Sequence, residues 1–482
     1  MKLVMRFEAL LEKREAKQIY LIKQLIIAGG QMNVHDVRRM LDLSKKSTDN
    51  YIEELVEAFE PFKNRCQIKY DGAQVTFSKA PDFSLEEVET NLYLSTPKYQ
   101  ILLYLLEEKE INPVRLSQEL KISESSLSRK IKDLNTILKE FELRIWQGKI
   151  IGEESQIRYF YFQLLWYLKQ GYEQSSSRES HIIESLERGL NLNFVPVVKK
   201  RILLWLRITK KRITVPDSQF SQFKEKFEPY KKDPLYLKLV PIIRRSFSFY
   251  AVEIKEEEAM LHFIFLIGMS VLSQEDFHAY SLQRSRLTPS AWCDTVILET
   301  ILRMYDPRNI RKELEATCYY HLSQIHIRLY FFVGDVETYD RANIWQLEET
   351  LSTRNIQSYV EKLLTLSCKE LQIEQNEQNS LLAMAAVKYL SVLTIVDVKV
   401  NREVHVGIAL QFDALFKEAA TNMLMLQLKS LNGVVVEPFE AGKKYDLVIT
   451  NTALDLNTTI YRITELGSAY DLKEIKKLVR QV

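Results

Sequence analysis

The strongest constraint on this fold is a segment that occurs twice. Residues 116–138 read LSQELKISESSLSRKIKDLNTIL, with apolar residues at helical spacing on both sides of a short polar break. Ser123 ends that break and is a candidate N-cap, because its hydroxyl can accept a hydrogen bond from a backbone N–H that the helix leaves free. The pattern predicts two short helices joined by a tight turn, which is a helix-turn-helix.

The earlier copy lies 79 residues before the later one. The paired positions are Val37 and Leu116, Leu41 and Leu120, Leu43 and Ile122, Ser44 and Ser123, Thr48 and Leu127, Ile52 and Ile131, and Leu55 and Leu134. In the helix before each unit, we pair Tyr20 with Tyr99 and Ile22 with Ile101. A repeat with its core positions in register argues for the motif far more strongly than a single match.

Each copy is followed by a candidate β-hairpin, so each unit is predicted to be a winged helix. The first hairpin, QIKYDGAQVTF, turns at Asp71-Gly72, which is a strong short-range hairpin signal. The second, LRIWQGKIIG, turns at Gln147-Gly148. We therefore predict winged helices at residues 1–80 and 90–152.

The outward positions of the second helices and of the wings carry hydroxyl groups and cations. Small hydroxyl side chains fit close to DNA, and cations can meet phosphates or guanine edges. A lysine on a hairpin is as often an ordinary solvated residue, so the two wing lysines are weaker candidates. The predicted DNA-binding residues are Lys45, Lys46, Ser47, Asn50 and Lys69 in the first unit, and Ser125, Ser126, Ser128, Arg129, Lys130, Lys132 and Lys149 in the second.

Composition restricts the alternatives. A net charge of +2 over 482 residues means that any DNA-binding surface is a local patch. The four cysteines are far apart and form no CxxC, so neither zinc nor disulfides are expected, which suits a cytoplasmic protein. The apolar runs near 261–272 and 381–398 are read as buried helices, because a membrane span needs about 20 apolar residues. We expect no cofactor, no metal, no membrane partner and no enzymatic activity.

The rest of the chain predicts a mainly α, multidomain protein. Residues 153–397 are almost wholly helical in pattern, with a boundary near Pro289 that divides them into all-helical bundles at 153–285 and 286–397. The polar run at 174–180 is read as a loop. From 398 to 482 strands alternate with helices, which predicts a small α/β domain with a parallel sheet.

This order of domains resembles the Mga/AtxA-like virulence regulators of Gram-positive bacteria. Residues 152–158 read GEESQIR, which looks like the G-[DN]-E-x-x-I-R junction of that family, with Glu153 in the Asp/Asn place. The resemblance implies that the bundles are phosphotransferase regulation domains (PRDs) and that the tail resembles the B component of a sugar phosphotransferase permease. It also implies a DNA-binding global regulator, an activator of virulence or metabolic genes, that is modulated by the phosphocarrier protein of the sugar phosphotransferase system.

PRDs of this kind are regulated by phosphorylated histidines, so the resemblance directs attention to two residues. A usual PRD pattern places an arginine seven residues after the histidine, and His321 and Arg328 match it. In the first bundle Trp205 stands seven residues before Arg212, so that site is lost. His262 lies in the region of another PRD histidine and is the second candidate. His326 is five residues from His321 and should face elsewhere.

The tail lacks the cysteine that the permease component phosphorylates, because none occurs after Cys368. A retained domain without this nucleophile suggests a role in assembly, so we expect a homodimer or larger oligomer through residues 400–482. Two alternatives remain open: a PRD-containing RNA-binding antiterminator, and a phosphotransferase system component. The repeated helix-turn-helix argues against the first, and the missing cysteine against the second.

Overall fold

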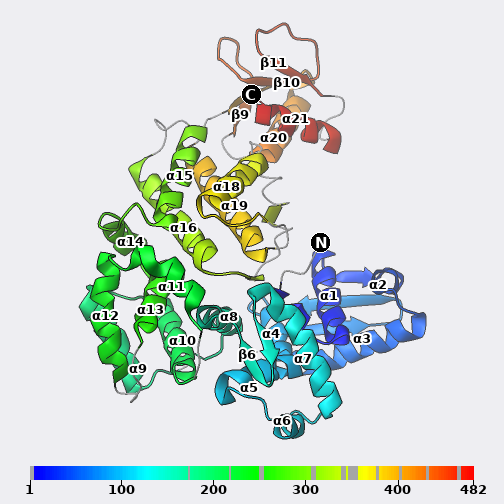
Figure 1. The fold of residues 1–482 in the computed structure, drawn as a ribbon. Helices are drawn as coiled ribbons and strands as arrows, with labels where there is room; N and C mark the ends of the chain where they lie inside the picture. The colour runs from blue at the N-terminus through cyan, green and yellow to red at the C-terminus, as the bar shows by residue number, and fades with distance from the viewer. Residues whose placement is uncertain are drawn as a thin grey trace.

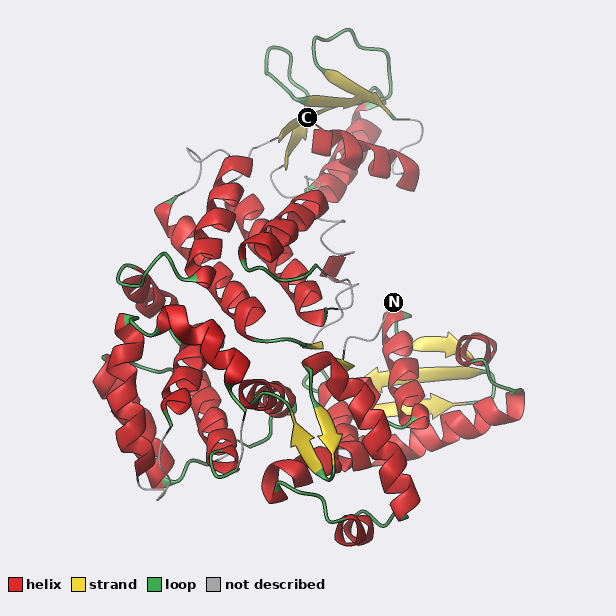
Figure 2. Cartoon of the chain, in the orientation of Figure 1, coloured by secondary structure: helices red, strands yellow, loops and turns green. Residues whose placement is uncertain are grey.

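The computed structural model describes residues 5–171, 174–215, 219–248, 255–305, 311–337, 344–345, 356–375, 379–400, 404–429, 434–463 and 468–481. The protein is mainly helical with a small parallel sheet near its C-terminus, as predicted (Figures 1 and 2). The C-terminal sheet lies at the opposite end of the helical region from the winged helices (Figure 1).

Both copies of the repeat contain the helices and the β-hairpin that a winged helix requires. The first contains α1 (Lys13–Ile27), α2 (Val34–Leu41), α3 (Lys45–Phe59), β2 (Gln31–Asn33), β3 (Cys66–Tyr70) and β4 (Gln74–Lys79), and the second contains α5 (Pro97–Glu108), α6 (Pro113–Glu119), α7 (Glu124–Leu138), β5 (Arg144–Trp146) and β6 (Lys149–Ile151). The two predicted N-caps are confirmed, since Ser44 accepts from the Ser47 N–H at 3.3 Å and Ser123 from the Ser126 N–H at 3.2 Å. The caps fix where each second helix begins.

The repeat is in register from Val37 onward, but its first helix is shifted by one residue. Tyr20 is 47% exposed whereas Tyr99 is 4% exposed, so pairing them is wrong. The burial pattern instead matches Ile19 to Tyr99 and Leu21 to Ile101. The first unit has one more residue between its first two helices, in the segment that contains β2.

A helix that the sequence analysis did not predict links the two units. Ser84 caps α4 (Leu85–Ser95), which starts within the expected linker. Phe83 and Val88 pack into the core of the first winged helix, while Tyr93 packs into the core of the second. The connection is therefore a packed helix rather than a free linker.

The helical region forms one continuous core. The first bundle contains α8 (Glu154–Tyr167), α9 (Ser177–Leu190), α10 (Pro196–Arg212), α11 (Ser221–Phe227), α12 (Pro234–Phe247), α13 (Glu256–Gly268) and α14 (Gln274–Ser281), and the second contains α15 (Pro289–Met304), α16 (Lys312–Phe331), α18 (Ile356–Glu370) and α19 (Ser380–Lys399). Helix α16 packs on α13 and α14 as well as on α15 and α19. The bundles and the second winged helix bury their apolar side chains in one cluster.

Two segments of this region bear on the sequence interpretation. The predicted loop at 174–180 is only partly correct, because Ser176 and Glu179 form a capping box and α9 starts at Ser177. Among the described helices, α19 alone has the length and apolarity to cross a membrane, but 56% of its most apolar stretch is buried inside the protein. It packs on α16 and α18 as a core helix of the second bundle.

The C-terminal domain has the elements that its sequence predicts. They are β8 (Val404–Ala409), α20 (Ala414–Leu428), β9 (Val434–Pro438), β10 (Leu447–Thr450), β11 (Thr459–Arg462) and α21 (Ala469–Gln481). All neighbouring strands are parallel, in the order β11-β10-β8-β9, and the domain has its own apolar core. The first strand lies inside the sheet, as in doubly wound folds.

Candidate functional site

The N-terminal turns of α3 present the predicted residues to solvent. Lys45, Lys46, Ser47 and Asn50 are all exposed. The Ser47 hydroxyl also shares a 2.8 Å hydrogen bond with the hydroxyl of the cap, Ser44. A helix N-terminus carries free N–H groups and a partial positive charge, so two lysines there suit a phosphate backbone. On the wing, Lys69 is exposed as well.

The corresponding turns of α7 present most, but not all, of the predicted residues to solvent. Ser125, Ser128, Arg129 and Lys132 are exposed and Ser126 is half-buried. The side chain of Lys130 is only 14% exposed and forms an ion pair with Glu12 at the start of α1. The prediction that Lys130 faces outward is therefore wrong, because the N-terminus of the first unit packs over it.

The second wing carries residues that the sequence analysis did not single out. Lys149 is exposed but pairs with Glu110 at 3.2 Å. The guanidinium of Arg144 lies 5.6 Å from the ring centre of Trp146, which is 56% exposed. Both residues flank buried Ile145 in the predicted strand, so the alternation of the hairpin already placed them on the outer face.

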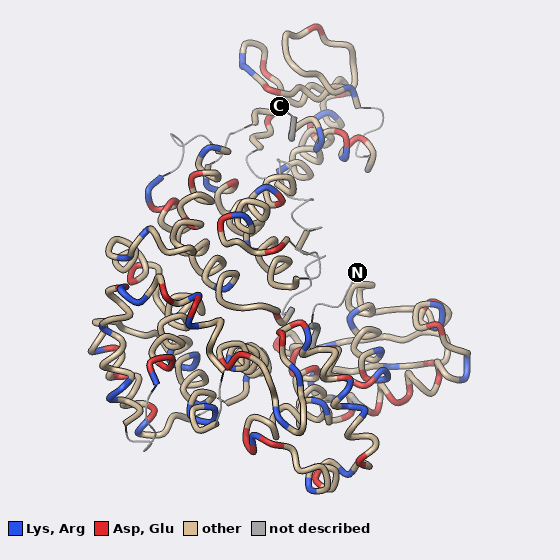
Figure 3. The backbone as a smooth tube through the Cα atoms, in the orientation of Figure 1, with Lys and Arg blue, Asp and Glu red and all other residues tan. Residues whose placement is uncertain are grey.

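Four of the predicted cations on α3 and α7 are exposed. Lys45, Lys46, Arg129 and Lys132 form no ion pair with any residue that the structure describes. Elsewhere, Lys and Arg are interspersed with Asp and Glu along the whole chain (Figure 3). The candidate DNA surface is thus a local feature of the two N-capped helices and not a general charge of the protein.

The junction at residues 152–158 leads into α8, which a buried ion network joins to α10 and α13 of the first bundle. Arg158 donates to both carboxylate oxygens of Glu258, at 2.6 and 2.7 Å, and to Glu154 at 2.9 Å. Arg212 donates to the two oxygens of Glu154 at 3.1 and 2.6 Å. All four side chains are buried, so the two arginines and two carboxylates neutralise one another.

His321 lies in a cavity of about 620 Å³ between the two bundles. The cavity is lined by α8, α10, α13, α16 and α19, and Arg328, two turns further along α16, lines it too. Burial and the nearby ammonium of Lys388 lower the pKa of His321, so its imidazole is neutral at neutral pH. A neutral ring nitrogen in an open cavity is able to accept a phosphoryl group.

His262 is placed very differently. It is 4% exposed, and its Nδ1 lies 2.7 Å from the carbonyl oxygen of Glu258. Trp205 and Phe247 pack edge-on against the ring. Burial lowers the pKa of His262 to about 4. The ring of His262 is therefore much less accessible to a protein donor of phosphate than that of His321, and its phosphorylation stays a prediction.

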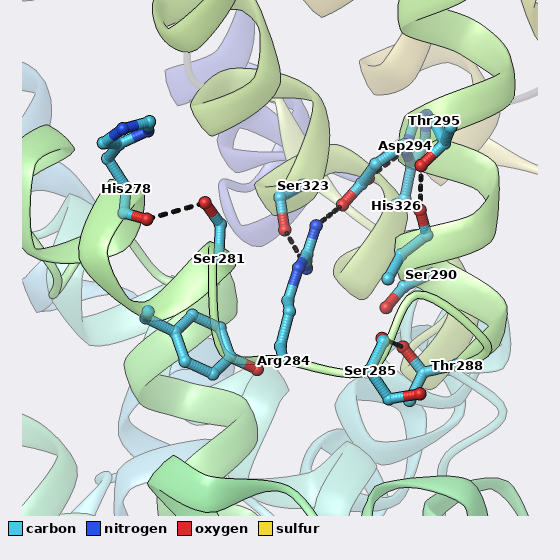
Figure 4. Close-up of polar contacts among 12 residues, drawn as sticks. His278, Ser281, Arg284, Ser285, Thr288, Ser290, Asp294, Thr295, Ser323 and His326 are labelled. Carbon is cyan, nitrogen blue, oxygen red and sulfur yellow. Dashed lines mark hydrogen bonds and ion pairs between the residues drawn. The ribbon is translucent and has the colours of Figure 1, made fainter.

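His326 faces away from the cavity, as expected, into a buried polar network. Its Nδ1 is 2.5 Å from Asp294 and its Nε2 is 2.8 Å from the Tyr389 hydroxyl. Figure 4 shows Arg284 reaching between Ser323 and Asp294. The side chains of this network come from α15, α16 and α19 and from the loop after α14. The network joins helices α15, α16 and α19 inside the second bundle.

The hydrogen-bond directions in this network define the charge of His326. Ser367 donates to the carbonyl oxygen of Leu363 at 2.8 Å, so the Tyr389 hydroxyl, 2.6 Å away, must donate to Ser367. The Tyr389 oxygen is then left to accept from Nε2–H, while Nδ1–H faces a carboxylate. Burial alone lowers the pKa of His326, but Cys293 and Asp294 raise it to about 10. His326 is therefore an imidazolium.

Comparison with known proteins gives one match. Residues 81–165 match the family model of the Mga helix-turn-helix domain. This span contains α4, the whole second winged helix, the 152–158 junction and most of α8. No curated protein matches the chain. The match indicates DNA as a partner and transcription regulation as the broad role.

Proposed function

We propose that this chain is a Mga-like global transcriptional regulator that contacts DNA with both winged helices, and the match of residues 81–165 to the Mga helix-turn-helix domain supports this proposal. The observation that carries the proposal is the pair of N-capped helices, each with two exposed cations that form no ion pair with a described residue. These cations are Lys45 and Lys46 at the start of α3, and Arg129 and Lys132 in the middle of α7. We propose further that it acts in the cytoplasm as an activator of virulence or metabolic genes. Two DNA-contacting units in one chain increase affinity through effective concentration.

The proposed recognition has modest sequence specificity. The exposed residues of α3 and α7 are mainly lysines and serines, with Arg129 and Asn50 as the side chains able to form two hydrogen bonds with one base. Groove width and DNA bending would then contribute much of the discrimination. The test is a mobility shift of the full chain with duplex DNA and with hairpin RNA over a series of KCl concentrations. Tighter binding to the RNA would favour the antiterminator alternative.

The proposed regulation is phosphorylation of His321 by a phosphocarrier protein. A phosphoryl group brings about −1.5 to −2 charges at neutral pH. Arg328 lines the same cavity and its Nε has no hydrogen-bond partner among the described residues. The same guanidinium donates to Asp335 at 2.7 Å. A phosphoryl group on His321 would compete with Asp335 for Arg328.

This competition would reach the DNA-binding units through residues 332–337, which we call the connecting segment. The Asp335 N–H donates to Ser380 at 3.0 Å and to Glu140, just after α7, at 3.3 Å. β7 (Val336–Glu337) pairs with β1 (Met5–Arg6), which leads into the first winged helix. Loosening Asp335 from Arg328 would thus alter contacts to both units at once.

The regulatory proposal is tested with phosphorylated phosphocarrier protein and mass spectrometry that preserves acid-labile phosphate. We expect one phosphoryl group on the wild type with a changed DNA affinity, and neither effect in His321→Ala. His278→Ala, an exposed histidine on α14, is the matched control and should behave as the wild type. Phosphorylation of His321→Ala to the wild-type level, or an unchanged DNA response, would reject the assignment.

We also propose a homodimer or larger assembly through the C-terminal domain. An apolar stripe on and beside α20 supports it, formed by Phe412, Leu415, Phe416, Met423 and Leu426, which are 40–80% exposed. A double substitution of Leu415 and Leu426 by lysine leaves the buried face of α20 intact, so the domain should still fold. We expect it to shift the protein toward monomer in analytical ultracentrifugation. A wild-type monomer at micromolar concentration would contradict the proposal.

A further inference from the structure

The cavity between the bundles carries more positive charge than its own carboxylates neutralise. Its charged lining consists of Lys169, Arg201, Arg328 and Lys388 against Glu86 and Asp335. Lys169 pairs with Glu86 at 3.0 Å, and Arg328 with Asp335 at 2.7 Å. Two cationic charges remain, and the neutral His321 does not compensate them.

The two remaining cations are Arg201 on α10 and Lys388 on α19. Arg201 donates to the carbonyl oxygens of Met269 and Ser270, and its guanidinium lies 4.9 Å from the ring centre of Trp166. These contacts hold the guanidinium at the cavity wall without neutralising it. Neither Arg201 nor Lys388 pairs with a carboxylate in the part of the chain that the structure describes.

The cations of the cavity act on one another. Burial lowers the pKa of Lys388, the neighbouring Arg328 and Arg201 lower it further, and Asp335 opposes them. Gathering like charges in a partly enclosed space opposes folding, and a bound anion would offset that repulsion. The charge comes from three helices of both bundles, α10, α16 and α19, so it is a property of the interface between them.

The same cavity also has apolar side chains in its lining. Phe162 and Trp166 of α8 and Ile325, Val392 and Ile395 of the second bundle line it. A volume of about 620 Å³ is in the range of small-molecule sites in proteins. A ligand that fits the cationic and the apolar side chains of this lining has a group with two negative charges and a compact uncharged body.

We propose that this cavity binds a small phosphate monoester without forming a covalent bond, with the phosphate between Arg201, Arg328 and Lys388 and the organic body against the apolar wall. A dianionic phosphate matches the excess of two charges and accepts several charge-assisted hydrogen bonds at once. This site is independent of whether His321 is phosphorylated. Where the regulatory proposal holds, the bound ester also covers His321 and protects it from the phosphocarrier.

The test uses the full chain, shown by intact mass to carry no phosphoryl group, and isothermal titration calorimetry. The probes are phenyl phosphate, glucose 6-phosphate and inorganic phosphate, with glucose as the uncharged comparison. We expect the two esters to bind more tightly than inorganic phosphate and glucose not to bind. Lys388→Gln should weaken ester binding about tenfold, since one charge-assisted hydrogen bond is lost, and Lys388→Arg should restore much of it. Lys238→Gln, an exposed lysine on α12, is the matched control.

The outcomes separate the two sources of phosphate. Ester binding that depends on Lys388 but not on Lys238 supports the site. If no ester binds the unmodified chain while the phosphocarrier still labels His321, the cavity serves only the covalent group and the proposal is overturned. Equal weakening by Lys388→Gln and Lys238→Gln also overturns it. Ester binding without any labelling of His321 would support this site while rejecting the regulatory proposal.

Discussion

The two winged helices share their local structure but differ in how they join the rest of the protein. The first buries Ile52, Val75 and their neighbours in a core of its own. The second buries Leu134, Phe141 and Ile150 in the same core as the helical bundles. From the first unit, Leu10, Leu11 and Ile19 reach that main core. One unit is an attached domain, and the other is part of the body of the protein.

Polar contacts also attach the first unit, beside these three apolar side chains. Lys130 of α7 pairs with Glu12, and Lys98 of α5 donates to the carbonyl oxygens of Ala9 and Leu11 at 3.0 and 3.2 Å. The partly exposed ion pair of Lys130 and Glu12 can be exchanged at small cost, whereas opening an apolar core is costly. A structural change in the bundles would therefore reach the second unit through the shared apolar core. It would reach the first unit partly through polar contacts that can change.

The largest expected effect comes from one core substitution in each unit. Phe141 is fully buried, with its ring 5.0 Å from that of Phe160 on α8, and Ile52 is fully buried in the first unit. Phe141→Ala and Ile52→Ala should each cost about 2–5 kcal/mol. Hydrogen exchange should then spread over the second unit and the bundles in Phe141→Ala but stay within residues 13–79 in Ile52→Ala. The same extent of exchange in both variants would show that the cores are not separate.

The second largest expected effect is that alkaline pH destabilises the bundles and the second unit more than the first unit. His326 has a folded-state pKa of about 10, above its ordinary value of 6.5. Its stabilising contribution is thus full below about pH 6.5, declines above it and is gone above about pH 10. Between pH 7 and 11 the bundles and the second unit should lose exchange protection together, while the first unit keeps more of its own.

The control for this pH effect is His326→Gln, because lysines and tyrosines elsewhere also titrate near pH 10. The variant should be less stable than the wild type at pH 7, and the difference between the two should shrink as pH rises. A difference that stays constant from pH 6 to 11 would mean that His326 is not charged in the folded protein.

The two recognition helices can be compared directly by removing matched pairs of cations. Lys45→Ala with Lys46→Ala removes two cations from the first unit, and Arg129→Ala with Lys132→Ala removes two from the second. If both units contact phosphates, each double variant should lower the slope of log affinity against log salt by about two. A change for one pair alone would assign DNA contact to a single unit.

The smallest expected effect concerns Lys130. Since it pairs with Glu12 and is mostly covered, Lys130→Ala should leave the salt dependence of DNA binding unchanged. The loss of this partly exposed pair should cost about 0.2–1 kcal/mol. Limited proteolysis should then cut more readily near the start of α1. A lower slope of log affinity against log salt in this variant would show that Lys130 contacts DNA.

Local patterns in the sequence predict much of the secondary structure. The Ser44 and Ser123 caps, the two hairpins and the alternating strands and helices of the tail all depend on residues within a few positions of one another, and all were predicted. The Ser176–Glu179 capping box obeys the same rule and was legible in the sequence, although it was read as a loop. Tyr20 does not correspond to Tyr99 because the first unit has one more residue between its first two helices, so a single spacing does not hold through the whole repeat.

Only the tertiary structure distinguished side chains whose local sequences look alike. His262, His321 and His326 all lie on apolar helices. His262 is buried among apolar side chains, His321 lines a cavity, and His326 is a buried cation. Lys130 and Arg129 are adjacent, but only Lys130 meets Glu12. Secondary structure follows from interactions between near neighbours, which the sequence displays. Exposure, charge and access depend on partners distant in the chain, such as Asp294 for His326 and Lys388 for His321, and only packing brings those together.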